Sequence, residues 1–200
     1  MSVAGNIGRR IQRMPKGKPI CINHFANEGS RKTVAKVLSR LAAAGELERL
    51  MRGIYMRPKI SHFAGQVRPN VTSLLRVLAQ VTGETIAIHG AEAVRAFGLS
   101  TQMQIEPVFY TSGASRKVEI GQTTIQLLHV PAQKLQHSGT NVGLALAALF
   151  YIGKAGINDT AIARIRAKLD QAEFKRLTDS KIPTWMKTAF SQSNRRPLTL

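Results

Sequence analysis

The sequence predicts an α+β fold, because apolar residues recur at helical spacing in some segments and alternate at strand spacing in others. The 44% hydrophobic content over 200 residues is enough to bury a sizeable core. Residues 58–70 contain two prolines and little periodicity, which is typical of a linker. We therefore expect a first domain at residues 1–60, a mixed α/β second domain at 70–192 and a disordered tail at 193–200.

The first domain is expected to contain three helices and a hairpin. Pro15 and Gly45 mark the ends of the first and third helices, and Ser30 is a favourable N-cap for the third. In chain order the expected elements are a helix at 3–14, an extended segment ending near 21, a brief helix at 22–26, a helix at 31–44 and a hairpin at 46–59.

The formal charge of +18 favours a polyanionic partner. Residues 1–70 hold 14 Lys and Arg against 3 acidic residues, so 14 − 3 = +11, whereas residues 71–200 hold 15 against 8, or +7. The excess is therefore concentrated in the first domain. Charge alone also suits RNA or an anionic lipid surface, so the choice of partner depends on the helices that carry it.

The helix expected after Ser30 has two different faces. An apolar stripe of Val and Leu at i, i+3, i+4 and i+7 faces the core, and the opposite face is centred on Lys32, Lys36, Ser39 and Ala43, flanked by Arg40. A solvated face usually mixes in Asp or Glu, and none occurs between Arg31 and Ala44. A helix of about 21 Å can lie in a DNA major groove about 12 Å wide.

Helix, helix, helix, hairpin is the element order of a winged helix-turn-helix domain, so we expect the first domain to bind double-stranded DNA. In such a domain the groove helix reads bases, and the wing contacts phosphates or the minor groove. A helical domain that packs against another protein is the alternative. The candidate DNA-binding residues are Ser30, Arg31, Lys32, Thr33, Lys36, Ser39, Arg40, Arg49, Arg52, Tyr55 and Arg57.

The second domain is expected to be α+β. The helix at 142–153 is apolar on nearly all faces, so it is either the centre of the domain or a dimer surface with Leu144, Leu146, Leu149 and Phe150 as contacts. A homodimer on DNA is expected because one winged helix reads only a half-site. The expected elements are helices at 71–81, 91–97, 142–153, 160–168, 171–180 and 183–190, a strand at 85–88, and a hairpin or small sheet from 107–111 and 118–130.

Few residues of the second domain suggest chemistry. Small residues, backbone N–H groups and two cations make one turn a candidate phosphate-binding site, and a plain hairpin turn is the alternative. The residues of this turn are Ser112, Gly113, Ser115, Arg116 and Lys117. His89 stands near Glu92, but a histidine at a strand end is more often a structural hydrogen-bonding group than a catalyst, so we expect no enzyme.

No metal or cofactor is expected. The single cysteine, Cys21, cannot form an internal disulfide, and the five histidines lack zinc-ligand spacing. Cys21 is expected to be buried and inert. The sequence shows neither a membrane-length apolar stretch nor a signal peptide, so a cytoplasmic location is expected.

The run GSRKTVAKVLSRLAAAGELERLMRGIYMRPK at residues 29–59 resembles the N-terminal winged-helix domain of the AbiEi-type antitoxins of bacterial abortive-infection systems. Ser39-Arg40-Leu41 and the Arg-Gly-Ile-Tyr of residues 52–55 are the specific part of the match. Residues 86–102 and 108–130 resemble the strand, helix and strand pair that follow in that family, whereas the last 45 residues match no part of it.

The resemblance implies a repressor that binds an inverted-repeat operator in its own promoter and counteracts a nucleotidyltransferase toxin, with no requirement for direct contact. The alternatives are a plasmid- or mobile-element-encoded regulator without a toxin, an RNA-binding module, and an adaptor that binds the toxin directly. The 6% aromatic content argues against RNA, because the aromatic residues do not cluster as a stacking platform.

Overall fold

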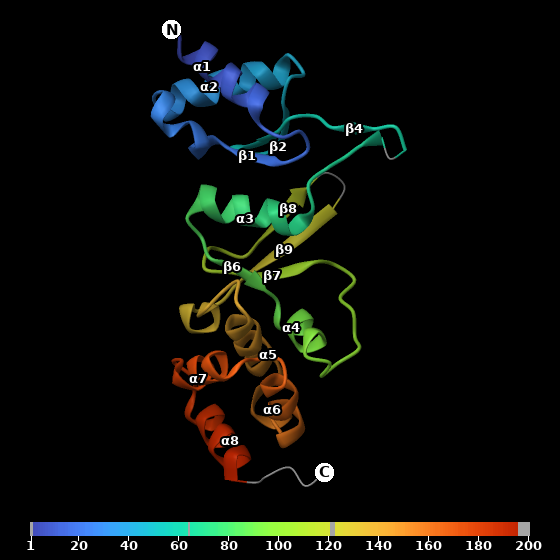
Figure 1. The fold of residues 1–200 in the computed structure, drawn as a ribbon, viewed down its shortest axis with the longest axis vertical. Helices are drawn as coiled ribbons and strands as arrows, with labels where there is room; N and C mark the ends of the chain where they lie inside the picture. The colour runs from blue at the N-terminus through green and yellow to red at the C-terminus, as the bar shows by residue number, and fades with distance from the viewer. Residues whose placement is uncertain (1, 64, 121–122, 196–200) are drawn as a thin grey trace. The chain divides into compact units, whose positions relative to one another are not determined.

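The computed structural model describes residues 2–63, 65–120 and 123–195. The chain divides into two compact units: unit 1 is Met1–Glu84 with Glu119–Thr123, and unit 2 is Thr85–Val118 with Thr124–Leu200. Both units combine helices with small sheets (Figure 1), so the predicted α+β class is confirmed.

Unit 1 begins with the elements that the sequence predicted, each within about three residues of its expected bounds. Side-chain hydroxyls cap two of its helices: the Ser2 hydroxyl accepts from the Gly5 N–H, and the Ser30 hydroxyl accepts from the Thr33 N–H. The elements are α1 (Val3–Arg13), β1 (Pro19–Cys21), the 3-10 helix η1 (Ile22–Glu28), α2 (Arg31–Ala43), β2 (Glu48–Met51) and β3 (Ile54–Met56).

The three strands form an antiparallel sheet in the order β1-β3-β2. Its central strand β3 is buried at every position. Tyr55 joins the core formed by α1, η1 and α2, which includes Phe25 and Leu38. Side chains alternate between the faces of a strand, so Ile54 and Met56 face the other way.

A fourth helix, α3 (Val71–Thr82), also belongs to unit 1. It packs against β1 and β3 through an apolar face that includes the buried residues Leu74 and Leu78, and the Asn23 side-chain amide donates to the Gln80 carbonyl oxygen at 3.2 Å. The sequence placed this helix in the second domain because the prolines before it are typical of a linker. The apolar sheet face that needs covering is visible only in three dimensions.

The expected linker contains a second antiparallel hairpin, β4 (Ile60–Ser61) and β5 (Gly65–Gln66). The Val67 N–H donates to the Lys59 carbonyl oxygen at 2.8 Å, which closes the base of the hairpin. Figure 1 shows this ribbon projecting from the rest of unit 1.

Most of a four-stranded sheet, in the order β6-β7-β9-β8, lies in unit 2, and the end of β8 and the start of β9 are grouped with unit 1. The strands are β6 (Ile86–Ile88), β7 (Val108–Thr111), β8 (Arg116–Ile120) and β9 (Thr123–His129). β6 pairs antiparallel with β7, and β7 pairs parallel with β9, an arrangement more complex than the predicted hairpin or small sheet. The helix α4 (Gly90–Ala96) follows β6 directly.

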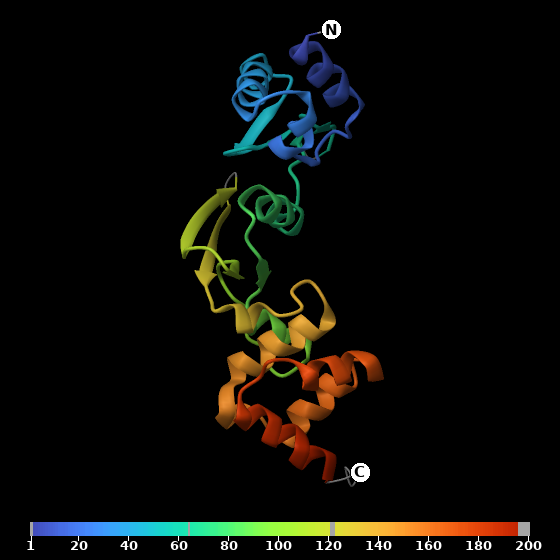
Figure 2. The same ribbon diagram turned by 90° about the vertical axis from the view of Figure 1, so that its left-hand side faces the viewer.

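The helix α5 (Asn141–Gly156) is the centre of unit 2. Leu146 and Leu149 are fully buried, and Leu144 and Phe150 pack at the edge of the same core. The dimer-surface interpretation of Leu146 and Leu149 is therefore wrong, because neighbouring helices of the same chain cover them. A short 3-10 helix, η2 (Ala132–Leu135), precedes α5. The helices that follow α5 gather beside it in Figure 2: α6 (Asp159–Arg166), α7 (Gln171–Asp179) and α8 (Thr184–Arg195).

The expected disordered tail begins inside a helix, because α8 continues to Arg195. The rest of that prediction, residues 196–200, lies outside the described residues. Across the described part of the chain, no helix has both the length and the apolar character needed to cross a membrane.

Candidate nucleic-acid interface

The helix α2 presents the face that the sequence singled out. Val34, Val37 and Leu38 are buried, and the basic and small residues of the opposite face are exposed. None of the salt bridges among the described residues involves this helix. The exposed residues, which we call the α2 basic face, are Lys32, Lys36, Ser39, Arg40 and Ala43.

At the start of α2 three candidate residues hold the helix in place. The Ser30 hydroxyl accepts from the Thr33 N–H at 3.2 Å and lies 2.8 Å from the Thr33 hydroxyl. Arg31 Nη1 donates to Asn23 Oδ1 in η1 at 3.4 Å. All three residues remain exposed, so capping and a ligand contact are compatible here.

The hairpin β2–β3 separates its four candidate residues into two groups. Arg49 and Arg52 are exposed, whereas Tyr55 is 3% exposed and belongs to the core. The prediction that Tyr55 contacts DNA is therefore wrong, because β3 is the central strand and both of its faces are covered. Arg57 is half-buried, and its Nη1 donates to the carbonyl oxygens of Gln12 and Met14 at 2.8 and 2.7 Å.

The turn between β2 and β3 is short and lies against the body of unit 1. Gly53 has a φ of +77°, and a Cβ atom there would lie 3.4 Å from the side chains of Ile22 and Val81. The expected wing therefore does not project. The projecting ribbon is instead β4–β5, with Lys59 before it and His62 near its tip.

Sequence reasoning missed this hairpin as a surface that could bind a ligand. A signal was present, because no Asp or Glu occurs between Glu48 and Glu84. Arg68, at the end of the ribbon, pairs through Nη2 with Glu48 Oε1 at 3.2 Å, and the Gln66 amide donates to the other oxygen of that carboxylate. The one acidic group beside the ribbon is thus already engaged.

The candidate phosphate turn in unit 2 uses its polar groups internally. The Gly113 N–H donates to the Thr111 hydroxyl at 3.0 Å, and the Ser112 hydroxyl accepts from the Thr85 N–H at 2.9 Å. Further bonds join Ser115 Oγ to the His129 N–H at 2.8 Å and Arg116 Nη1 to the Ala114 carbonyl oxygen at 3.0 Å; Lys117 is exposed. This geometry matches the alternative, a hairpin turn held by its own hydrogen bonds.

His89 has a structural position at the start of α4. Its Nδ1 accepts from the Ala91 N–H at 3.3 Å and lies 2.9 Å from Gln104 Nε2, while its ring centroid is 4.7 Å from that of Tyr110. Partial burial lowers the pKa of His89. Glu92 is paired instead with Arg95, whose hydrogen bonds lower the pKa of that carboxyl.

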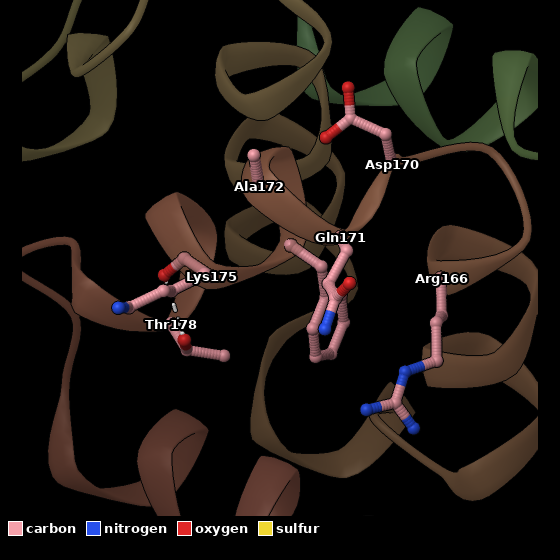
Figure 3. A pocket seen from close by; sticks show the side chains of 7 residues that line it. Arg166, Asp170, Gln171, Ala172, Lys175 and Thr178 are labelled. Carbon is pink, nitrogen blue, oxygen red and sulfur yellow. Dashed lines mark hydrogen bonds between the residues drawn. The ribbon is translucent and has the colours of Figure 1, made fainter.

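One pocket of about 730 Å³ lies on unit 2 between α6 and α7. Figure 3 shows Arg166 and Lys175 on opposite sides of it. The Arg166 guanidinium lies over the Phe174 ring, 4.5 Å from its centroid, and the Asp170 carboxylate caps α7 by accepting from the Glu173 N–H at 2.7 Å. The charged groups of Arg166 and Asp170 thus have structural partners.

The single cysteine is also structural. Cys21 is buried, and its sulfur accepts from the Asn23 N–H at 3.2 Å as the N-cap of η1. The His24 ring accepts from the Cys21 N–H at 3.1 Å, which completes a capping box. Among the described residues no three His, Cys, Asp or Glu side chains gather as a metal site would require.

Residues 6–177 match a family model described as "Family of unknown function (DUF6088)". No curated protein and no solved structure matches the chain. The matched span covers most of the chain and includes both the α2 basic face and the sheet of unit 2. The chain therefore belongs to DUF6088, a family of unknown function.

Proposed function

We propose that this protein binds double-stranded DNA in a sequence-specific way, with α2 in the major groove. The observation that carries the proposal is the α2 basic face: exposed, free of acidic residues and without an ion pair among the described residues. Such a face complements the negative potential of a DNA groove.

The architecture of unit 1 supports the proposal that it is a winged helix-turn-helix. Its order is helix, strand, 3-10 helix, helix, strand, strand, and the first strand pairs beside the last in a β1-β3-β2 sheet. In such a domain the helix before the hairpin enters the major groove. With 13 residues, α2 is about 20 Å long, which suits that role.

Two groups of residues receive different roles. Lys32, Lys36, Ser39 and Arg40 face outward from the helix and are assigned to base edges and to the phosphates that border the groove. Arg49 and Arg52 are exposed on the hairpin and are assigned to phosphates, which fix position but do not read sequence.

The biological setting that we propose is autoregulation. The resemblance to AbiEi-type antitoxins suggests a repressor that binds an inverted repeat as a homodimer and opposes a nucleotidyltransferase toxin indirectly. A regulator without a toxin partner and an adaptor that binds the toxin directly are the competing settings. A nucleotidyltransferase in the adjacent reading frame supports the antitoxin setting, and co-purification of the two products favours the adaptor.

Binding-site selection followed by gel shifts at 150 mM salt tests DNA recognition. We expect at least ~10³-fold preference for one inverted repeat over random duplex, with steep salt dependence. Equal affinity for all duplexes contradicts the proposal, and so does displacement of the duplex by single-stranded RNA.

A charge-matched pair of variants separates the α2 basic face from net charge. The variant Lys32→Gln, Lys36→Gln, Arg40→Gln removes three positive charges from α2, and the variant Lys175→Gln, Arg176→Gln, Lys187→Gln removes three exposed charges from unit 2. We expect only the first variant to lose sequence preference. Equal losses in both mean that binding is general electrostatics rather than recognition by α2.

A further inference from the structure

The hairpin β4–β5 presents apolar side chains to solvent. The Phe63 side chain is fully exposed, at 102%, and Ile60 is 82% exposed. In the described part of unit 1 these are the two large hydrophobic side chains that lie mostly in solvent. Both belong to the projecting ribbon, three positions apart in the sequence, and exposed apolar groups near one another are typical of a contact surface.

The hairpin is attached to the body of unit 1 at its base. Both oxygens of the Glu48 carboxylate on β2 are bound by it, one by Gln66 and the other by Arg68. The Lys59 carbonyl oxygen accepts from the Val67 N–H at 2.8 Å, so the two strands close on each other. Phe63 is thus presented from a ribbon fixed to the strand that follows α2.

The charge around the hairpin selects the kind of partner. Lys59 flanks it and His62 precedes Phe63, whereas the charge of Arg68 is paired with Glu48; no further acidic residue occurs before Glu84. A second copy of a chain that carries +18 would bring like charges to this surface. A polyanion with an apolar interior matches both the positive charge and the exposed aromatic side chain. Duplex DNA has this composition, because its apolar stacked base pairs lie between two charged phosphate strands.

We propose that the β4–β5 hairpin binds the minor groove of duplex DNA and inserts Phe63 between base pairs. This inference rests on the proposed function and adds a second contact, on DNA that flanks the segment read by α2. Apolar wedges of this kind partly unstack a base step and bend the duplex by about 20–90°. Lys59 contacts a phosphate beside the groove, while Arg68 stays paired with Glu48 and holds the hairpin in place.

The test measures bending and affinity on the duplex chosen by binding-site selection. Phe63→Ala removes the wedge, and Phe63→Leu keeps an apolar one. Ile105→Ala is the matched control, because Ile105 is 101% exposed and lies in unit 2. Circularly permuted probes report the bend angle, gel shifts the affinity, and circular dichroism the fold.

We expect Phe63→Ala to lose most of the bend and to bind about tenfold more weakly, because less aromatic area is buried against the bases. Phe63→Leu restores much of the bend, and Ile105→Ala matches the wild type. Methylation interference in the major groove of the DNA segment proposed to be read by α2 stays unchanged in all three variants.

Two results overturn the inference while the proposed function stands: an unchanged bend and affinity in Phe63→Ala, or loss of self-association in sedimentation with the bend intact, which assigns the hairpin to a second copy. Failure of the wild type to prefer any duplex overturns the proposed function itself.

Distamycin, which occupies the minor groove, should compete with the wild type and hardly at all with Phe63→Ala.

Discussion

Arg57 Nη1 lies 2.7 Å from the carbonyl oxygen of Met14, the residue that caps α1. The same nitrogen donates to the Gln12 carbonyl oxygen at 2.8 Å. The guanidinium therefore satisfies backbone acceptors that the end of a helix leaves open, and it joins the chain after β3 to α1. A residue expected to contact DNA instead holds two elements of unit 1 together.

Replacing Arg57 by Ala should destabilise unit 1 by about 1–3 kcal/mol, because two charge-assisted hydrogen bonds are removed and two carbonyl groups are left without their partner. Chemical denaturation measures the effect, and hydrogen exchange in α1 locates it. Arg52→Ala, at an exposed position on the neighbouring turn, should change stability by less than about 0.5 kcal/mol. Equal effects at the two positions would show that the Arg57 hydrogen bonds do not stabilise the unit.

Lys36→Ala and Ser39→Ala should change which DNA sequence is preferred, because each removes a side chain that we assign to a base edge, at a cost of about 1–3 kcal/mol. Both side chains are exposed on the outward face of α2. Arg52→Ala should instead weaken binding to all sequences alike and lower the salt slope by about one. Selection experiments on the three variants measure these effects, and unchanged preferences in the first two would show that another face of α2 meets the DNA.

Gly90→Ala should destabilise unit 2, because a Cβ atom at Gly90 would lie 2.4 Å from the Tyr151 Cβ atom, where α4 approaches α5. We expect a destabilisation of about 1–3 kcal/mol, typical of overpacking. Gly8→Ala is the matched control: Gly8 is also helical, and no atom lies within 4 Å of its added Cβ. That exchange should stabilise α1 by about 0.5–1 kcal/mol. Thermal unfolding of the two variants should thus shift in opposite directions.

The stability of unit 2 should fall on acidification through the range below about pH 6.5, the ordinary pKa of histidine. Burial lowers the pKa of His89 in the folded protein, so the unfolded chain binds more protons in this range and becomes favoured as the pH falls. The contribution of His89 is fully present above that range. His89→Asn keeps an N-cap acceptor but does not titrate, so its unfolding temperature should depend less on pH.

Fluorescence of Trp185, the only tryptophan of the chain, reports unfolding of unit 2. An exchange of His62 to Asn in the unit 1 hairpin serves as the control and should leave the Trp185 transition unchanged. If the unfolding temperatures of His89→Asn and the wild type depend on pH in the same way, His89 does not couple protonation to folding.

The α2 basic face was predictable because its signals are local. Ser30 marks the start of the helix, the spacing of Val34, Val37 and Leu38 fixes the buried side, and the outward side follows from 3.6 residues per turn. For the same reason the bounds of most helices were predicted closely. A helix that ends at a capping residue needs no information from distant parts of the chain.

Predictions failed where the environment of a residue is set by distant segments. Tyr55 looked like a wing residue until both faces of β3 proved to be covered, and Leu146 and Leu149 looked available until the other helices of unit 2 enclosed them. Burial on the second side of a strand or helix depends on partners far away in the sequence, so periodicity does not reveal it.

The sequence by itself determined the α+β class, the bounds of most helices and the basic face of α2, because capping, periodicity and charge act over a few residues. Only the tertiary structure decided that α3 belongs to unit 1 and that Arg57 hydrogen-bonds to the end of α1. It also decided that residues 58–70 include a hairpin bound to the Glu48 carboxylate. Each of these depends on contacts between residues that are far apart in the chain, which local patterns do not encode.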